Sequence, residues 1–194
     1  MHHIHHSEAF ILGSRESGED SKTILLYATG LGLVYAKAQG LRKLSSKLRY
    51  TLQNFSYAKV DLVRGKEIWR ITTAVPIDSN TDILCFPERE QVVARISSLV
   101  TRLVAGEEHN DEIFFLLKSL YSTLRSTILL DSKYCAKIEL YYVARILMTL
   151  GYLSRNAYEF ISDDVVAIPE VLNDTEYRQK LVKEINEALN LSQL

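Results

Sequence analysis

One stretch of the sequence decides the fold class: GLGLVYAKAQGLRKLSSKLRYTLQNF, which runs from Gly30 to Phe55. Its first part, Leu31–Gln39, alternates side chains with the period of a β-strand that has one buried face. Gly40 closes this strand, and LRKLSSKLRY then breaks the alternation with two serines and several basic residues. The stretch therefore predicts a β-strand followed by a basic loop.

The predicted loop gathers positive charge in a chain whose formal net charge is only −1. Five cations lie within thirteen residues: Lys37, Arg42, Lys43, Lys47 and Arg49. Such a cluster binds a polyanion by displacing its condensed counterions, and Tyr50 and Phe55 add rings on which unpaired bases can stack. The alternative is a solvated loop that keeps a strand edge soluble.

The first 78 residues have the pattern of strands and turns that is typical of a small β-barrel. Glycines separate runs of strand periodicity, and the short turns at Thr29–Gly30 and Gly65–Lys66 are typical of hairpins. We predict five strands: His5–Ser14, Lys22–Ala28, Leu31–Gln39, Asn54–Arg64 and Glu67–Val75. This rhythm, with the longer connection after the third strand, is typical of an oligonucleotide-binding (OB) barrel.

Alternation assigns the two faces of these strands. We expect five residues in the barrel core: Val34, Ala36, Ala38, Trp69 and Ile71. The opposite face of the third strand carries Tyr35, Lys37 and Gln39. Lys37 is therefore predicted to point outward beside the basic loop.

Pro76 is predicted to end the strand region, and residues 79–90, SNTDILCFPERE, are predicted to form a connection. Beyond them the apolar period lengthens from two to between three and four residues, which predicts amphipathic helices. Four apolar stripes follow: Val92–Val104, Phe114–Leu124, Tyr134–Leu150 and Tyr177–Leu189. The predicted fold class is α+β, with an OB-type domain over residues 1–78 and an α-helical bundle over residues 79–194.

Charge and cysteine content limit the class of protein. Through Asp78 eleven basic residues stand against seven acidic ones, and the remainder has twelve against seventeen, so a basic half precedes an acidic half. Cys85 and Cys135 are the only cysteines, which disfavours a disulfide framework. No apolar run is long enough to span a bilayer, so we expect a cytoplasmic protein. A metal site is not predicted at the N-terminal histidines: His2, His3, His5 and His6.

The sequence offers little for catalysis. Gly30 and Gly32 lack the third glycine of a dinucleotide site, and Gly65–Lys66 lacks the rest of a phosphate loop. Adjacent acids, such as Asp163–Asp164 and Glu107–Glu108, point in different directions and are usually solvated. We therefore predict a binding protein rather than an enzyme, with no catalytic residue, no cofactor and no metal.

The stretch from Glu8 to Val75 also resembles a known family. The resemblance is carried, in order, by Phe10–Arg15, Glu19–Ser21, Thr29–Arg42, Ser46–Lys47 and Leu52–Phe55. Their order and spacing are similar to the N-terminal domain of the bacterial recombination mediator family RecO. Further on, IFFLLKSLYSTL and VARILMTLGYL resemble the helical half of that family.

The resemblance implies a role in DNA repair. Members of the RecO family bind single- and double-stranded DNA, anneal complementary strands, and act with RecR and the single-stranded DNA-binding protein to load RecA onto coated strands. DNA contact is thereby implied for the matching basic positions: Lys37, Arg42, Lys43, Lys47 and Arg49. Tyr50 is predicted to contact DNA by base stacking, from its position next to these residues in the sequence. An acidic partner tail would need a basic rim on the helical half, for which Arg95, Arg102, Arg125 and Arg145 are available.

The chain departs from the family pattern in one respect. Many members continue with a C-x-x-C repeat that binds zinc, whereas SRNAYEF, without cysteine, follows Leu153 here. Two other functional classes stay open. The barrel can serve a protein-interaction adaptor by docking an acidic peptide, without DNA binding. A small-molecule enzyme would need a convergent set of polar residues in a cleft.

Overall fold

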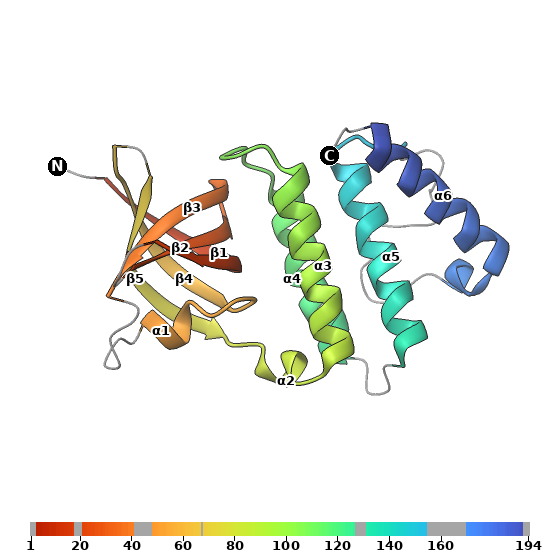
Figure 1. The fold of residues 1–194 in the computed structure, drawn as a ribbon, viewed down its shortest axis with the longest axis horizontal. Coiled ribbons are helices and arrows are strands. Elements are labelled where there is room, and N and C mark those ends of the chain that lie inside the picture. The colour runs from red at the N-terminus through yellow and green to blue at the C-terminus, as the bar shows by residue number, and fades with distance from the viewer. Residues whose placement is uncertain are drawn as a thin grey trace. The chain divides into compact units, whose positions relative to one another are not determined.

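A computed structural model describes residues 3–17, 21–40, 48–66, 68–126, 131–154 and 170–191 (Figure 1). These residues form two compact units. The first unit is Met1–Thr81 with Ala105–Phe114, and the second is Asp82–Val104 with Phe115–Leu194. The predicted domain limits, 1–78 and 79–194, stay a prediction, because a compact unit need not fold alone.

Five strands of the first unit close into a barrel in the order β1-β2-β3-β5-β4. The strands are β1 Ile4–Glu16, β2 Ser21–Ala28, β3 Gly32–Gln39, β4 Tyr57–Arg64 and β5 Trp69–Asp78. All neighbours are antiparallel except β3 and β5, which pair in parallel at Ala36 with Trp69 and Lys37 with Arg70. Together with the helices that follow, this barrel confirms the predicted α+β class.

The barrel core has the composition that alternation predicted. Its buried cluster includes Val34, Ala36, Ala38, Trp69 and Ile71, as expected. The two alanines of β3 are fully buried, and their small side chains leave room for Ile24, Leu26 and Leu62 inside a narrow barrel.

A short helix corrects the prediction that the connection from Gly40 to Gln53 is only a loop. Helix α1, Leu48–Thr51, lies between β3 and β4 in the chain. Leu52 joins the barrel core and Leu48 packs against it, while the Leu52 amide donates to the Leu48 carbonyl at 2.9 Å. Because residues four apart share a helix face, both leucines reach the core only if this turn is helical.

Two predicted strand limits are wrong by three residues. Strand β4 begins at Tyr57 rather than Asn54, because Phe55 has a positive φ of 68° that no strand residue adopts. Strand β5 continues past Pro76 to Asp78. A register shift lies between the pairs Tyr57–Asp78 and Ala58–Pro76, and a proline without an N–H is tolerated beside such a bulge.

The segment Ala105–Phe114 completes the barrel unit although it follows helix α3, Pro87–Leu103, in the chain. The Leu33 amide donates to the Gly106 carbonyl at 3.2 Å, and the Tyr27 hydroxyl donates to the Asn110 carbonyl at 3.0 Å. Burial raises the pKa of Tyr27 to about 12, so this hydroxyl stays protonated. The segment therefore covers the outer surface around Tyr27 and Leu33, and the exposed part of β2 and β3 lies towards their other ends.

Gly32 permits this close approach. It has a positive φ of 74°, and a Cβ at this position would stand 2.2 Å from the Glu108 carbonyl oxygen. One residue before Glu108, the Glu107 carboxylate accepts from the Trp69 indole at 3.0 Å and from the Arg64 guanidinium. The hydrogen bond from Arg64 lowers the pKa of Glu107.

The second unit is helical. Its elements are α2 Thr81–Leu84, α3 Pro87–Leu103, α4 Asp111–Ser126, α5 Ser132–Thr149, the 3₁₀ turn η2 Glu170–Asn173 and α6 Thr175–Leu191, where Thr81 and the first turn of α4 belong to the barrel unit. The predicted connection over residues 79–90 is wrong in part, since it contains α2 and the start of α3. Pro87 occupies the first helical position, where the missing N–H has no intrahelical partner to lose.

The apolar stripes and helix ends agree with the predicted helices. Val92, Ile96 and Val100 of α3 and Ile138 of α5 are buried. The Asp131 side chain caps α5 by accepting from the Tyr134 amide at 2.7 Å. Gly151, with a φ of 80°, follows the end of this helix. Among the described residues, no helix combines the length and apolar character needed to cross a membrane.

Candidate nucleic-acid interface

A row of cations crosses the outer surface of the barrel. Arg15 of β1 lies opposite Thr23 of β2, Thr23 lies opposite Lys37 of β3, and Lys37 lies opposite Arg70 of β5. Directly opposed residues point to the same side of a sheet, and neighbouring strands are about 4.8 Å apart. Arg15, Lys37 and Arg70 therefore share one surface across four strands.

A small hollow lies beside this row. The next set of opposed residues is Gly13, Leu25 and Tyr35, and Tyr35 is 43% exposed. The Arg15 guanidinium stands 5.9 Å from the centre of the Tyr35 ring, and Thr23 of the same surface is buried. The hollow has a volume of about 160 Å³, and its lining residues are Gly13, Ser14, Arg15, Thr23, Leu25 and Tyr35.

A larger, polar hollow of about 560 Å³ lies at the end of the barrel beside α1. Its polar lining residues are Ser14, Glu16, Lys22, Arg49, Gln53 and Asn54. The Ser14 hydroxyl donates to the Asn54 amide oxygen at 3.0 Å, and Ser14 lines both hollows. Two cations and two amide side chains suit a phosphate backbone. The negative charge of the Glu16 carboxylate offsets part of the positive charge of this hollow.

The predicted site residues are placed as follows. Lys37 belongs to the cation row and is half-buried, and Arg49 lines the polar hollow. Tyr50 is 68% exposed on α1. Arg42, Lys43 and Lys47 lie outside the described residues. Assignment of these residues to DNA stays a prediction.

Sequence reasoning missed four residues of this surface: Arg15, Lys22, Arg70 and Tyr35. Alternation did place Tyr35 on the outward face together with Lys37. The register between strands brings Arg15 and Arg70 to Lys37, and single-strand periodicity does not contain that register.

Charge pairing separates this row from another cation of the barrel. Arg64 binds the Glu107 carboxylate and stacks on Trp69 at 4.9 Å, so its charge holds the segment Ala105–Phe114 in place. Within the described ranges, no carboxylate forms an ion pair with Arg15, Lys37 or Arg70. The charges of these three residues therefore suit a polyanion on the outer surface.

The sequence of this chain is similar to those of known proteins. Residues 1–80 match the family described as Recombination protein O N terminal. A DNA repair protein RecO from Desulfitobacterium hafniense is 26% identical over 152 residues, which cover 78% of this chain and 54% of the relative. Another from Dehalococcoides mccartyi is 29% identical over 150 residues, which cover 77% of this chain and 57% of the relative.

Residues 1–80 form a RecO N-terminal domain, and about three quarters of the chain is similar to RecO proteins. These matches confirm the resemblance predicted from the sequence, and the barrel is the OB fold of that domain. A further RecO relative, from Desulforamulus reducens, is 31% identical over 116 residues, which cover 60% of this chain and 45% of that protein. The chain spans about half the length of the curated RecO relatives that it matches.

Proposed function

We propose that this protein is a DNA-binding recombination mediator in DNA repair and that it holds DNA on the outer surface of its barrel. The row of Arg15, Lys37 and Arg70 is the observation that carries the proposal. Three cations across one row can each displace a counterion condensed on a strand. Arg49 and Lys22 extend the positive charge into the polar hollow.

The finer activities follow from the RecO relatives by analogy. The protein anneals complementary strands and, together with RecR and the single-stranded DNA-binding protein, favours loading of RecA onto coated strands. It acts as a binder and performs no covalent chemistry. OB folds hold single strands in grooves that combine cations with stacking rings, which suits an annealing protein.

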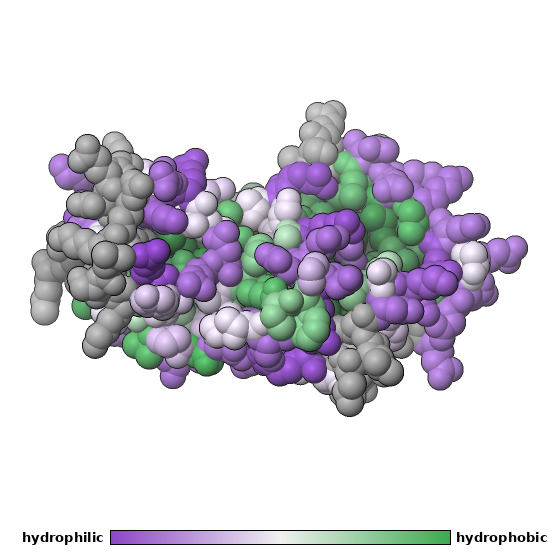
Figure 2. Space-filling model, turned by 60° about the horizontal axis from the view of Figure 1, so that its bottom comes forward, coloured by the Kyte–Doolittle hydropathy of each residue, from purple (hydrophilic) through white to green (hydrophobic). Residues whose placement is uncertain are grey.

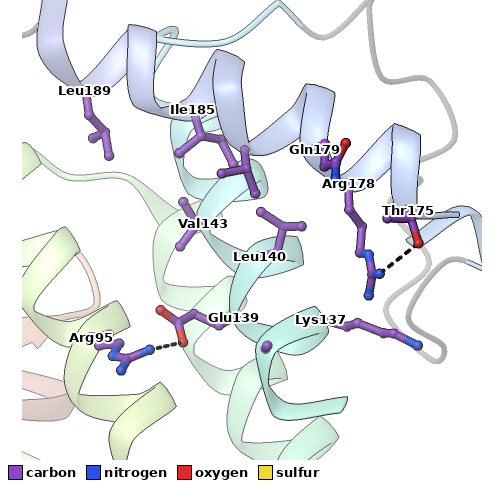
Figure 3. A pocket seen from close by; sticks show the side chains of 12 residues that line it. Arg95, Lys137, Glu139, Leu140, Val143, Thr175, Arg178, Gln179, Ile185 and Leu189 are labelled. Carbon is purple, nitrogen blue, oxygen red and sulfur yellow. Dashed lines mark hydrogen bonds and ion pairs between the residues drawn. The ribbon is translucent and has the colours of Figure 1, made fainter. Parts of the chain in front are cut away.

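A groove in the helical unit supports a protein partner. It has a volume of about 720 Å³ between α5 and α6, and Figure 2 shows hydrophobic residues gathered in this part of the molecule. In Figure 3, Leu140 and Val143 of α5 point towards Ile185 of α6. Lys137 and Arg178 add cations at the rim.

This groove suits the acidic tail of the single-stranded DNA-binding protein, because an apolar floor and a cationic rim match a peptide that is both acidic and partly apolar. Of the four arginines offered by the sequence, only Arg95 lines the groove, where it pairs with Glu139 at 2.9 Å. Arg125 pairs with Asp82, and Arg145 is buried against Tyr141.

DNA binding is tested by reversing the charge of the row. The triple variant Arg15→Glu, Lys37→Glu, Arg70→Glu should lose most affinity for a fluorescent oligonucleotide in an anisotropy titration. The slope of log affinity against log salt for a single strand should flatten from about −2, at roughly −0.7 per phosphate contact, towards zero. Sequence should not matter, since phosphate contacts carry no sequence information.

The matched control reverses three exposed lysines elsewhere, Lys59→Glu, Lys133→Glu and Lys180→Glu, and so changes the net charge equally. If both triple variants weaken binding alike, net charge rather than the row determines affinity. If the unmodified protein binds an acidic peptide and no oligonucleotide, the adaptor function replaces the proposed one.

A further inference from the structure

The hollow beside Tyr35 has the form of a subsite for a flat ring. Tyr35 is an outward-facing aromatic residue in the middle of a strand, and Leu25 beside it provides apolar surface. Gly13 lies opposite Leu25 and has no side chain, and a Cβ there would meet no atom within 4 Å. The opening therefore exists because residue 13 is glycine.

The hollow is large enough to hold more than a single water molecule. Its 160 Å³ is about five times the roughly 30 Å³ that one water occupies in the liquid. The Arg15 guanidinium stands 5.9 Å from the ring centre, close to the outer limit of about 6 Å for a cation–π contact. Such a loose contact costs little to open, so Arg15 can move aside for a ring or cover it.

Phosphate contacts do not distinguish a single strand from a duplex, whereas a stacking ring does. The faces of unpaired bases are accessible, and those of paired bases are covered by their neighbours in the stack. Stacking is also tolerant of sequence, because every base has a π-face. A ring placed beside a cation row therefore adds preference for single strands to charge-driven binding.

We propose that Gly13, Arg15, Leu25 and Tyr35 form a subsite that holds one unpaired nucleobase and gives the barrel surface its preference for single-stranded DNA. This inference rests on the proposed DNA-binding function. It assigns stacking to Tyr35, whereas the sequence had suggested Tyr50, a residue that lines neither hollow. The phosphates on either side of the base then meet Lys37 and the cations of the polar hollow.

The test uses the full chain and three probes: a single-stranded oligonucleotide of thymines, a strand of equal length with abasic positions throughout, and a duplex. Tyr35→Leu should lower affinity for the thymine strand by about 5- to 150-fold, the loss expected for one stacked base. Affinity for the abasic strand and for the duplex should change less than about twofold. The salt slope should stay unchanged, because no charge is removed.

Two further variants keep the test decisive if Tyr35→Leu perturbs the strand. Tyr35→Phe keeps the ring and should retain the affinity for the thymine strand. Gly13→Val leaves every charge and Tyr35 in place but fills the hollow, and no positive φ at Gly13 opposes the substitution. It should reproduce the selective loss seen with Tyr35→Leu.

An equal loss on thymine and abasic strands in Tyr35→Leu would overturn the subsite, since the effect would then not depend on bases. So would a Gly13→Val variant with full affinity for the thymine strand. In both cases the charge-reversal result would still support DNA binding by the cation row. Failure of the unmodified protein to bind any of the three probes would instead overturn the proposed function itself, together with the subsite.

Discussion

The barrel surface and the helical groove differ in chemistry although each is a shallow hollow on one compact unit. The barrel presents cations, amides and one outward ring around two hollows, of which the larger is lined mainly by polar side chains. The groove between α5 and α6 presents mainly apolar surface, with polar and charged side chains among its lining residues. The first suits a polyanion with stacking bases, and the second suits apolar side chains of a peptide. The two binding functions should therefore be separable by mutation.

The largest expected effect is on the stability of the barrel unit and comes from Gly32. This glycine lets the segment Ala105–Phe114 pack closely against the barrel. Gly32→Ala combines a positive φ of 74° with a Cβ that would stand 2.2 Å from the Glu108 carbonyl oxygen. We expect a loss of about 3 kcal/mol or more in the free energy of unfolding of the barrel. Urea unfolding followed by the fluorescence of Trp69, the only tryptophan, measures the barrel alone.

Gly30→Ala is the matched control. Gly30 has the same φ of 74°, but a Cβ there meets no atom within 4 Å. This variant should lose only the cost of the backbone strain, about 1–2 kcal/mol. Helical ellipticity recorded in parallel measures the second unit. If the two variants are equally unstable, the close approach at Glu108 contributes nothing. If fluorescence and ellipticity shift together, the two units unfold as one.

The fold could be predicted to a large extent because its signals are local. Period two placed Val34, Ala36 and Ala38 in the core, and a period between three and four placed Val92, Ile96 and Val100. The errors arose where tertiary contacts override local signals. Leu48 and Leu52 reach the core and impose a helical turn, and the bulge at the start of β4 lets β5 continue through Pro76.

The candidate site could be predicted only in part, for the same reason. A cluster of charge in one loop is visible in sequence, and so is the outward face that carries Tyr35 and Lys37. The neighbours of Lys37 come from β1 and β5, which are 22 and 33 residues away in the chain at Arg15 and Arg70. Only strand register brings these residues together, and register depends on the whole barrel.

A substitution in the groove tests whether peptide binding can be lost while DNA binding by the barrel is kept. Val182 is 42% exposed and lines the groove, so Val182→Glu should not disturb the fold. A carboxylate there repels an acidic peptide and must lose water on binding, so affinity for the partner tail peptide should fall about tenfold or more. Affinity for a single-stranded oligonucleotide should change less than about twofold.

Asn186→Glu is the control for the groove, because Asn186 is exposed on the same helix, does not line the groove, and gains the same charge. Isothermal titration with the tail peptide and anisotropy with the oligonucleotide give the two affinities for each variant. A parallel loss of both ligands in Val182→Glu would show that the two surfaces do not act separately. Equal peptide affinity in the two variants would remove the groove as the docking site.

The smallest expected effect concerns the acid dependence of the barrel. The hydrogen bond from Arg64 holds the pKa of Glu107 below its ordinary value of 4.5. A carboxyl whose pKa is lower in the folded state contributes stability that is present above its unfolded pKa and is lost as the pH falls through its folded pKa. The Glu107 side chain is 44% exposed, so solvent screening limits this contribution to less than about 1 kcal/mol. Glu107→Gln should therefore lower barrel stability slightly at pH 7 and reduce its decline below pH 4.5, as read by Trp69 fluorescence.

An unchanged acid transition in this variant would mean that the Arg64 contact does not stabilise the attachment of Ala105–Phe114. The segment would then be held by its other contacts, such as those of Leu33 with Gly106 and of Tyr27 with Asn110.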